Sequence, residues 1–314
     1  MIVIATHERD LGADFVIRHL VHKQVPYLRV DTDTLGSPAR HFGFENGAAH
    51  LTYDGLSLRS DDVKALWARR FASPAVIEQS QPDYRKFVAR ELTDVMECFI
   101  DTVEAPCMNA FEADRRAGNR LVQCVVAQAV GFSVPDSVVT QDTLKAKAFI
   151  ADHDKTVTKA ISFGIISPER DEITHTSRID DKSSLEGLAG CPSLIQAEVI
   201  KKTEWRVTTV GHNLFAARTK SGASVDRLDW RRSQDVSEIF ERGELPGDVS
   251  EKLLSLCDRS NIHFGAHDLI ETPNGEFYFL ETNPAGQWGW LEVQLGLPIG
   301  EAVASWLISA SGQR

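Results

Sequence analysis

The segment from Ala266 to Pro284 constrains the fold most, because it contains two strand-like stretches joined by Asn274-Gly275. Asn-Gly favours a tight hairpin, since both residues tolerate the positive φ of a type I′ turn. With that turn, the register places Asp268 opposite Glu281. The same register pairs Leu269 with Leu280, Glu271 with Tyr278 and Pro273 with Glu276. The sequence therefore predicts a hairpin that brings two acidic side chains together.

Asn283 extends this acidic cluster, because side chains two residues apart on a strand share a face. Ile270, Phe277 and Phe279 are expected on that face nearer the turn. Opposed Cβ atoms lie about 4.5–5.5 Å apart in such a pair. Two like charges about 4 Å apart repel each other by about 4 kcal/mol at an effective dielectric constant of about 20. Hard oxygen ligands of this kind suit Mg²⁺ or Mn²⁺, with phosphates completing the coordination shell. The alternative is a pair of edge-strand acids that are solvated or paired to an arginine.

His267 precedes Asp268 and points to the opposite face by the same period of two, so it is not expected to bind the metal. Trp288, a few residues after the hairpin, is more often a packing aromatic than a peptide contact.

The rest of the chain reads as mixed α/β. Residues 1–31 alternate strand, helix and strand without a Gly-rich dinucleotide loop. Apolar residues at helical spacing predict helices over Asp83–Val103 and, as one element, Ala113–Val130. After Pro192 the pattern is strongly β, with a helix over Pro246–Ser260. We divide the 314 residues into an N-terminal domain at 1–112, a central subdomain at 113–195 and a C-terminal subdomain at 196–314.

Composition excludes several classes of function. The net charge of −11 argues against a general nucleic-acid-binding protein. Five scattered cysteines show no metal-type spacing and favour reduced thiols. No segment approaches the roughly 18 apolar residues of a membrane span, so we expect no membrane partner and a cytoplasmic location.

The pattern Asp268, Glu281-x-Asn283 resembles the magnesium site of the ATP-grasp superfamily. The resemblance implies an ATP-grasp fold with an N-terminal pre-ATP-grasp βαβ domain, and ATP with Mg²⁺ as cofactors. It implies that Lys159, in Val157-Thr-Lys-Ala, contacts the nucleotide phosphates. Arg120 stands where the family usually has a first phosphate-binding lysine. The remaining positions carried over are Gln196, Ala197, Glu198 and Val199 at the adenine edge, Glu204 at the ribose, and Arg206 at the phosphates or the substrate carboxylate.

Three of these residues have simpler explanations. Lys159 could be an ordinary solvated lysine, the commonest state of that residue. Glu204 and Arg206 share one strand face, so they could form a mutual salt bridge.

Within the superfamily, Glu281-Thr-Asn-Pro-Ala-Gly-Gln-Trp288 and Arg69-Arg70 resemble the microviridin-type graspetide synthetases, as does Asp229-Trp-Arg-Arg232. That likeness implies a ligase that phosphorylates Asp or Glu side chains of a ribosomal precursor peptide. Macrocyclic ester or amide links to Thr, Ser or Lys would follow, and a homodimer is possible. One alternative is an ATP-grasp ligase that joins a free amino acid or amine to a carboxylate. Another is a non-catalytic peptide-binding module on a decayed scaffold, supported only by Arg120.

Overall fold

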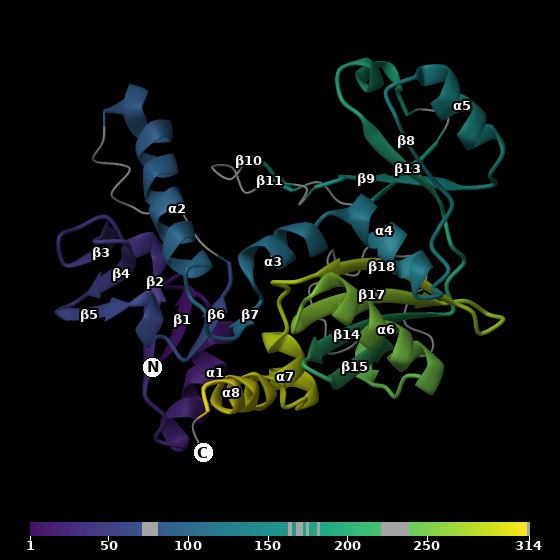
Figure 1. Ribbon diagram of the computed structural model, residues 1–314. Helices are drawn as coiled ribbons and strands as arrows, with labels where there is room; N and C mark the ends of the chain where they lie inside the picture. The colour runs from purple at the N-terminus through teal and green to yellow at the C-terminus, as the bar shows by residue number, and fades with distance from the viewer. Residues whose placement is uncertain are drawn as a thin grey trace.

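The structure is a computed structural model that describes residues 1–70, 81–162, 165–167, 172–173, 176–180, 183–220 and 239–312. Figure 1 shows three regions: an N-terminal α/β layer, a small sheet with a helix packed on it, and a larger sheet formed by the C-terminal part of the chain. The expected α/β class is confirmed. None of the helices within the described ranges is long and apolar enough to cross a membrane.

The N-terminal sheet is parallel and has the order β2-β1-β6-β7. Its strands are β1 (Ile2–Thr6), β2 (Tyr27–Asp31), β6 (Ala65–Ala68) and β7 (Cys107–Met108). All five residues of β1 are buried, as expected for a parallel strand with both faces covered. Ile2 and Ile4 pack toward α1 (Leu11–His22) and α8 (Ile299–Ala310), whereas Val3 and Ala5 pack toward α2 (Arg85–Asp101). The last helix of the chain thus covers the first domain (Figure 1).

A small antiparallel meander packs on α2, and the sequence analysis did not predict it. It consists of β3 (Arg40–Glu45), β4 (Ala48–Tyr53) and β5 (Leu56–Arg59). Phe42 meets Phe99 of α2 with ring centroids 5.1 Å apart. The meander closes the second face of the N-terminal sheet.

The helix predicted over Ala113–Val130 is wrong, because the structure has two helices there: α3 (Phe111–Ala117) and α4 (Arg120–Ala129). The break comes at Gly118 and Asn119. Asn119 Oδ1 accepts hydrogen bonds from the backbone N–H groups of Leu121 and Val122, and this cap begins the second helix.

The central sheet has the order β12-β9-β13-β8 and is antiparallel. It contains β8 (Ser137–Thr140), β9 (Thr156–Lys159), β12 (Ser177–Ile179) and β13 (Ser193–Ala197), with α5 (Thr143–Ala151) packed on it. A separate pair, β10 (Ile165–Ser167) and β11 (Glu172–Ile173), follows β9. This sheet presents Lys159 and the end of β13 toward the larger sheet.

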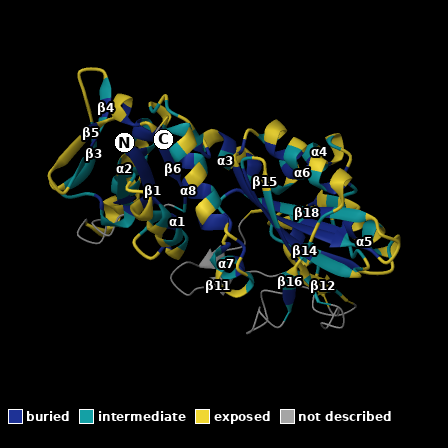
Figure 2. Cartoon of the chain, turned by 90° about the horizontal axis from the view of Figure 1, so that it is seen from below, coloured by how far each residue is buried: buried dark blue, intermediate teal, exposed yellow. Residues whose placement is uncertain are grey.

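The large sheet has the order β16-β15-β14-β17-β18, which leaves β18 as an outer strand. Its strands are β14 (Thr203–Val210), β15 (Asn213–Thr219), β16 (Phe240–Arg242), β17 (Phe264–Glu271) and β18 (Phe277–Asn283). One face packs against α4 and α6 (Gly247–Ser260), and α7 (Gly289–Leu295) follows the last strand. Figure 2 shows β14 as buried, whereas α4 and α6 beside the sheet carry exposed residues.

The β17–β18 hairpin differs from the prediction at its turn. Gly275 has φ 83° but Asn274 does not have positive φ, and the Gly275 N–H donates to the Thr272 carbonyl at 2.9 Å. This is a wider turn than the predicted type I′, and it pairs Glu271 with Phe277 and Leu269 with Phe279. An irregularity after Asp268 then shifts the register by one residue.

The register shift restores the predicted pairing at the acidic end, where Asp268 faces Glu281. It also moves Phe279 to the opposite face, where it is fully buried with the residues under α4 and α6. The prediction that Phe277 and Phe279 share the face of the acids is therefore wrong. Tyr278 lies between Phe277 and Phe279 along β18 and pairs with Ile270 of β17.

Candidate nucleotide and metal site

Asp268 and Glu281 lie directly opposite each other on β17 and β18, as the sequence predicted. Asp268 is only 5% exposed. Asn283 is two residues beyond Glu281, and its Oδ1 atom accepts a hydrogen bond from the Ala285 N–H at 3.1 Å. That bond leaves the second lone pair of this oxygen to a further partner. The hairpin thus gathers two carboxylates and one carboxamide at the end of the sheet.

Each carboxylate has an arginine partner. Arg206 donates through Nη1 to Asp268 Oδ1 at 2.7 Å, and Arg120 Nη2 lies 2.7 Å from Glu281 Oε2. The alternative in which the two acids pair with arginines is therefore realised in the structure. The alternative of a Glu204–Arg206 salt bridge is wrong, because Glu204 pairs with Lys201 at 2.9 Å.

Lys159 adds a third cation to this site. Burial lowers the pKa of its ammonium group, while the charge of Glu281 acts in the opposite direction and that of Arg120 lowers it further. An ordinary solvated lysine, the alternative considered from the sequence, would not be buried beside Glu281 and Arg120. Lys159, Arg120 and Arg206 together outnumber Asp268 and Glu281, so the cluster has net positive charge and suits an anionic ligand.

Asp268, Glu281 and Asn283 offer oxygen atoms of the kind that magnesium prefers. No group of three or more His, Cys, Asp or Glu side chains suitable for a metal occurs among the described residues. Two carboxylates and the Asn283 amide cannot fill an octahedral shell alone. They fit the usual protein share of a magnesium ion whose other ligands are substrate phosphates and water. The assignment of Asp268, Glu281 and Asn283 as metal ligands stays a prediction on this basis.

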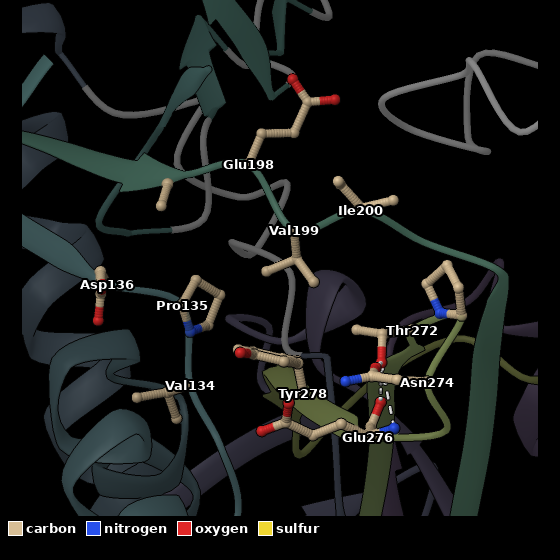
Figure 3. A pocket seen from close by; sticks show the side chains of 12 residues that line it. Val134, Pro135, Asp136, Glu198, Val199, Ile200, Thr272, Asn274, Glu276 and Tyr278 are labelled. Atoms are coloured by element: carbon tan, nitrogen blue, oxygen red, sulfur yellow. Dashed lines mark hydrogen bonds between the residues drawn. The ribbon is translucent and has the colours of Figure 1, made fainter. Parts of the chain in front are cut away.

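A cavity of about 450 Å³ opens where the central and large sheets meet (Figure 3). Its lining is mostly apolar on the side of the chain that follows β13, where Val199 and Ile200 lie, and Tyr278 of β18 faces them from the other side. A flat heteroaromatic ring fits such a slot. The full lining is Val134, Pro135, Asp136, Ala197, Glu198, Val199, Ile200, Thr272, Pro273, Asn274, Glu276 and Tyr278.

Three of the four residues predicted at the adenine edge, Ala197, Glu198 and Val199, do line this cavity. Gln196 does not. It is 3% exposed within β13, and its Nε2 donates to Ser137 Oγ at 2.8 Å. Successive side chains of a strand point to opposite faces, so Gln196 points away from the cavity. Sequence spacing alone could not predict this, because it does not give the residue at which β13 ends.

Glu198 is held by Arg178, which donates to both of its carboxylate oxygens at 2.7 Å. This pair lowers the pKa of Glu198, chiefly through the hydrogen bond from Arg178. The side chain of Glu198 is therefore engaged on the central sheet, and its backbone is the part available to the cavity.

The sequence analysis missed Tyr278 and Ile200 as lining residues. Tyr278 was assigned to the opposite face because the register shift in β18 was not foreseen. Ile200 lies beyond β13, which ends at Ala197. An isoleucine that is 77% exposed beside a cavity is a signal that only the structure supplies.

The segment that follows β18 packs closely against Ala266 and Arg206 at Gly286. A Cβ atom added to Gly286 would lie 2.5 Å from Ala266 Cβ and 3.2 Å from Arg206 Nη2. Trp288 is fully buried against Phe15, which confirms its reading as a packing residue. Arg231 and Arg232 lie outside the described residues.

The MvdD pre-ATP grasp domain family matches residues 1–115. The chain has a pre-ATP-grasp domain followed by an ATP-grasp fold. It resembles the microviridin-type graspetide synthetases, and three solved structures extend the likeness over the whole chain.

The first is a RiPP-associated ATP-grasp ligase of Chryseobacterium gregarium, in complex with ADP and a leader and core peptide. It has 26% identity and a TM-score of 0.86, covering 98% of this chain and 96% of that one. The second is the macrocyclase MdnC of Microcystis aeruginosa MRC, bound with the precursor peptide MdnA, with 25% identity, a TM-score of 0.85 and coverage of 98% and 99%. The macrocyclase MdnB of the same organism has 29% identity, a TM-score of 0.78 and coverage of 98% of both chains. No curated protein sequence matches.

Proposed function

We propose that this chain is an ATP- and Mg²⁺-dependent ligase that phosphorylates Asp or Glu side chains of a ribosomal precursor peptide and closes macrocycles to Thr, Ser or Lys. The observation that carries the proposal is the opposed pair Asp268 and Glu281, surrounded by three cationic side chains beyond the end of a cavity of the right size for a nucleobase. The full-length likeness to peptide macrocyclases supports the substrate class.

The reaction begins with attack of a peptide carboxylate oxygen on the γ-phosphorus of ATP, which forms an acyl phosphate and releases ADP. A hydroxyl or amine of the same peptide then attacks the acyl carbon, phosphate leaves with the bond electrons, and the nucleophile loses its proton. Magnesium held by Asp268, Glu281 and Asn283 would neutralise phosphate charge. Because phosphoryl transfer needs charge stabilisation more than covalent help, Lys159 and Arg206 suffice as the principal protein groups.

Arg206 and Arg120 also have a role before the nucleotide binds. They neutralise the carboxylates that would otherwise repel each other across the hairpin. With a nucleotide bound, Asp268 and Glu281 would be the groups that hold magnesium, and Arg206 and Arg120 would be available to the phosphates. The positive cluster thus pre-organises the site for an anion.

Closure within one bound peptide is favoured by proximity, with effective molarities that reach about 10⁵ M or more in well-oriented reactions. No additional nucleophilic residue of the protein is needed for such a step. The five cysteines are free, as in a reducing compartment, and we propose that the reaction takes place in the cytoplasm, where ATP is abundant.

The test is incubation of the purified protein with the peptide encoded beside its gene, ATP and Mg²⁺. Mass spectrometry should show loss of one water per ring, with stoichiometric ADP and phosphate. Product formation with free amino acids but not with the peptide would instead support the small-molecule ligase. Absence of any ATP turnover would support the non-catalytic alternative. Light scattering in the same buffer tests the predicted homodimer.

A further inference from the structure

Strand β18 is an outer strand of the large sheet, yet its backbone is not open at Thr282. The Thr282 N–H donates to Gln123 Oε1 at 3.0 Å, and the Thr282 carbonyl accepts from Gln123 Nε2 at 2.6 Å. A side-chain carboxamide carries the same donor and acceptor as a peptide group. Gln123 therefore takes the place of a neighbouring strand for one residue, and that residue lies between Glu281 and Asn283.

The side chain of Thr282 is fixed from the opposite direction. Its Oγ1 lies 2.8 Å from His267 Nδ1, and His267 Nε2 lies 3.0 Å from Thr209 Oγ1. Thr282 is 3% exposed and His267 is completely buried. Both ring nitrogens of His267 are therefore engaged by threonine hydroxyls. Thr282 thus has its backbone and its side chain both held.

Gln123 is itself firmly placed. It is 5% exposed on α4, and its Nε2 also donates to the Ala117 carbonyl at 2.6 Å, in the helix before. Arg120, one turn earlier on α4, pairs with Glu281. One short helix therefore supplies both the cation that meets Glu281 and the carboxamide that fixes the next residue of the strand.

We propose that Gln123 is a positioning residue that holds Glu281 and Asn283 in the geometry required for the nucleotide-bound magnesium. The inference rests on the proposed function and names a residue outside the predicted ligand set. Residues that orient metal ligands from outside the coordination shell typically change metal affinity about 10- to 100-fold when they are replaced.

The first measurement needs no nucleotide. In the Gln123→Leu variant, hydrogen exchange at the Thr282 amide, read by mass spectrometry of peptides that span it, should accelerate at least about tenfold. Gln128→Leu is the matched control, because Gln128 is exposed on the same helix. Unchanged exchange in Gln123→Leu would show that Gln123 does not hold the Thr282 backbone, whatever the protein's function.

The second measurement is a Mg²⁺ titration of the binding of a fluorescent ADP analogue to the full chain. The Mg²⁺ concentration for half-maximal binding should rise about 10- to 100-fold in Gln123→Leu and stay unchanged in Gln128→Leu. Gln123→Glu keeps the side-chain shape and the acceptor but loses the N–H donor, so it should show the same direction of change.

The outcomes separate the two proposals. If the wild-type protein does not bind the nucleotide with Mg²⁺, the proposed function fails. If it does bind, but Gln123→Leu and Gln123→Glu need no more Mg²⁺ than wild type, the positioning role fails alone. If neither variant folds, Gln123 serves stability in general and the specific role is withdrawn.

Discussion

Arg206 lies directly opposite Asp268 on the adjacent strands β14 and β17, and their side chains form a 2.7 Å ion pair with each only 6% exposed. The pair joins a phosphate-binding residue and a metal ligand predicted from separate parts of the chain. Replacing one partner of such a buried pair leaves the other charge without compensation. The site and the stability of the sheet are thereby linked.

We expect Asp268→Asn to abolish ligation and also to lower the free energy of unfolding by about 3 kcal/mol, because the buried Arg206 loses its anionic partner. Glu281→Gln should abolish ligation too, but cost about 1 kcal/mol, since its partner Arg120 is 20% exposed and retains water. Urea unfolding and the mass-spectrometric ligation assay measure the two effects. Full activity of either variant would remove the metal assignment.

Gly286→Ala should destabilise the protein by about 1 to 3 kcal/mol, because the new methyl group would lie 2.5 Å from Ala266 Cβ and crowd Arg206. Ligation activity should also fall at temperatures where the variant is still folded, because the added methyl group would displace Arg206. Thermal unfolding followed by circular dichroism checks the first effect. Gly247→Ala is the control, because nothing lies within 4 Å of an added Cβ there. Equal melting temperatures for both variants would refute the predicted clash.

Much of the acidic end of the site could be predicted from the sequence, because the period of two and the Asn-Gly turn place Asp268 opposite Glu281. That pairing came from a turn of the wrong type, and the register shift after Asp268 compensated for it. The shift places Phe279 in the core under α4 and α6, a contact with distant segments that local sequence does not encode.

Contacts between distant segments were equally outside the reach of sequence patterns. Arg206 and Asp268 are separated by 62 residues, and only the strand order brings them together. Gln123 meets Thr282 across 159 residues. Sequence patterns also did not predict that Gln196 would be absent from the cavity lining and that Tyr278 would be part of it, because the end of β13 and the register shift of β18 set their positions.

Glu204 is predicted to recognise the ribose of ATP. Its carboxylate is held by Lys201 at 2.9 Å and is 12% exposed, so it is fixed rather than freely solvated. We expect the wild-type protein to prefer ATP over 2′-deoxy- or 3′-deoxy-ATP in kcat/KM by about 10- to 100-fold, the usual value of a hydrogen bond to a charged group. Glu204→Gln should reduce that preference several-fold, whereas Glu241→Gln, an ion-paired acid on β16, should keep it. An unaltered preference in Glu204→Gln would place the ribose elsewhere.

Asp114 should make the protein less stable as pH rises from about 4 to about 6. Burial raises the pKa of its carboxyl to about 6, against the lowering effects of the Asn109 hydrogen bond and the Arg69 charge. The native state therefore keeps a proton that the unfolded chain, with a pKa near 3.8, has already lost in this range. Proton binding by the native state alone means that stability falls with increasing pH, and the full loss persists above about pH 6.

Asp114→Asn should consequently raise the free energy of unfolding by roughly 2 to 3 kcal/mol at pH 7, the equivalent of a shift of about two pKa units. At pH 3.5 the gain should vanish, because both states of the wild-type side chain are then largely protonated. Urea unfolding at several pH values measures the difference. Glu112→Gln, an exposed acid in the same first turn of α3, should give no such pH-dependent gain. If Asp114→Asn shifted stability equally at pH 3.5 and pH 7, the cause would be lost packing and not the proton.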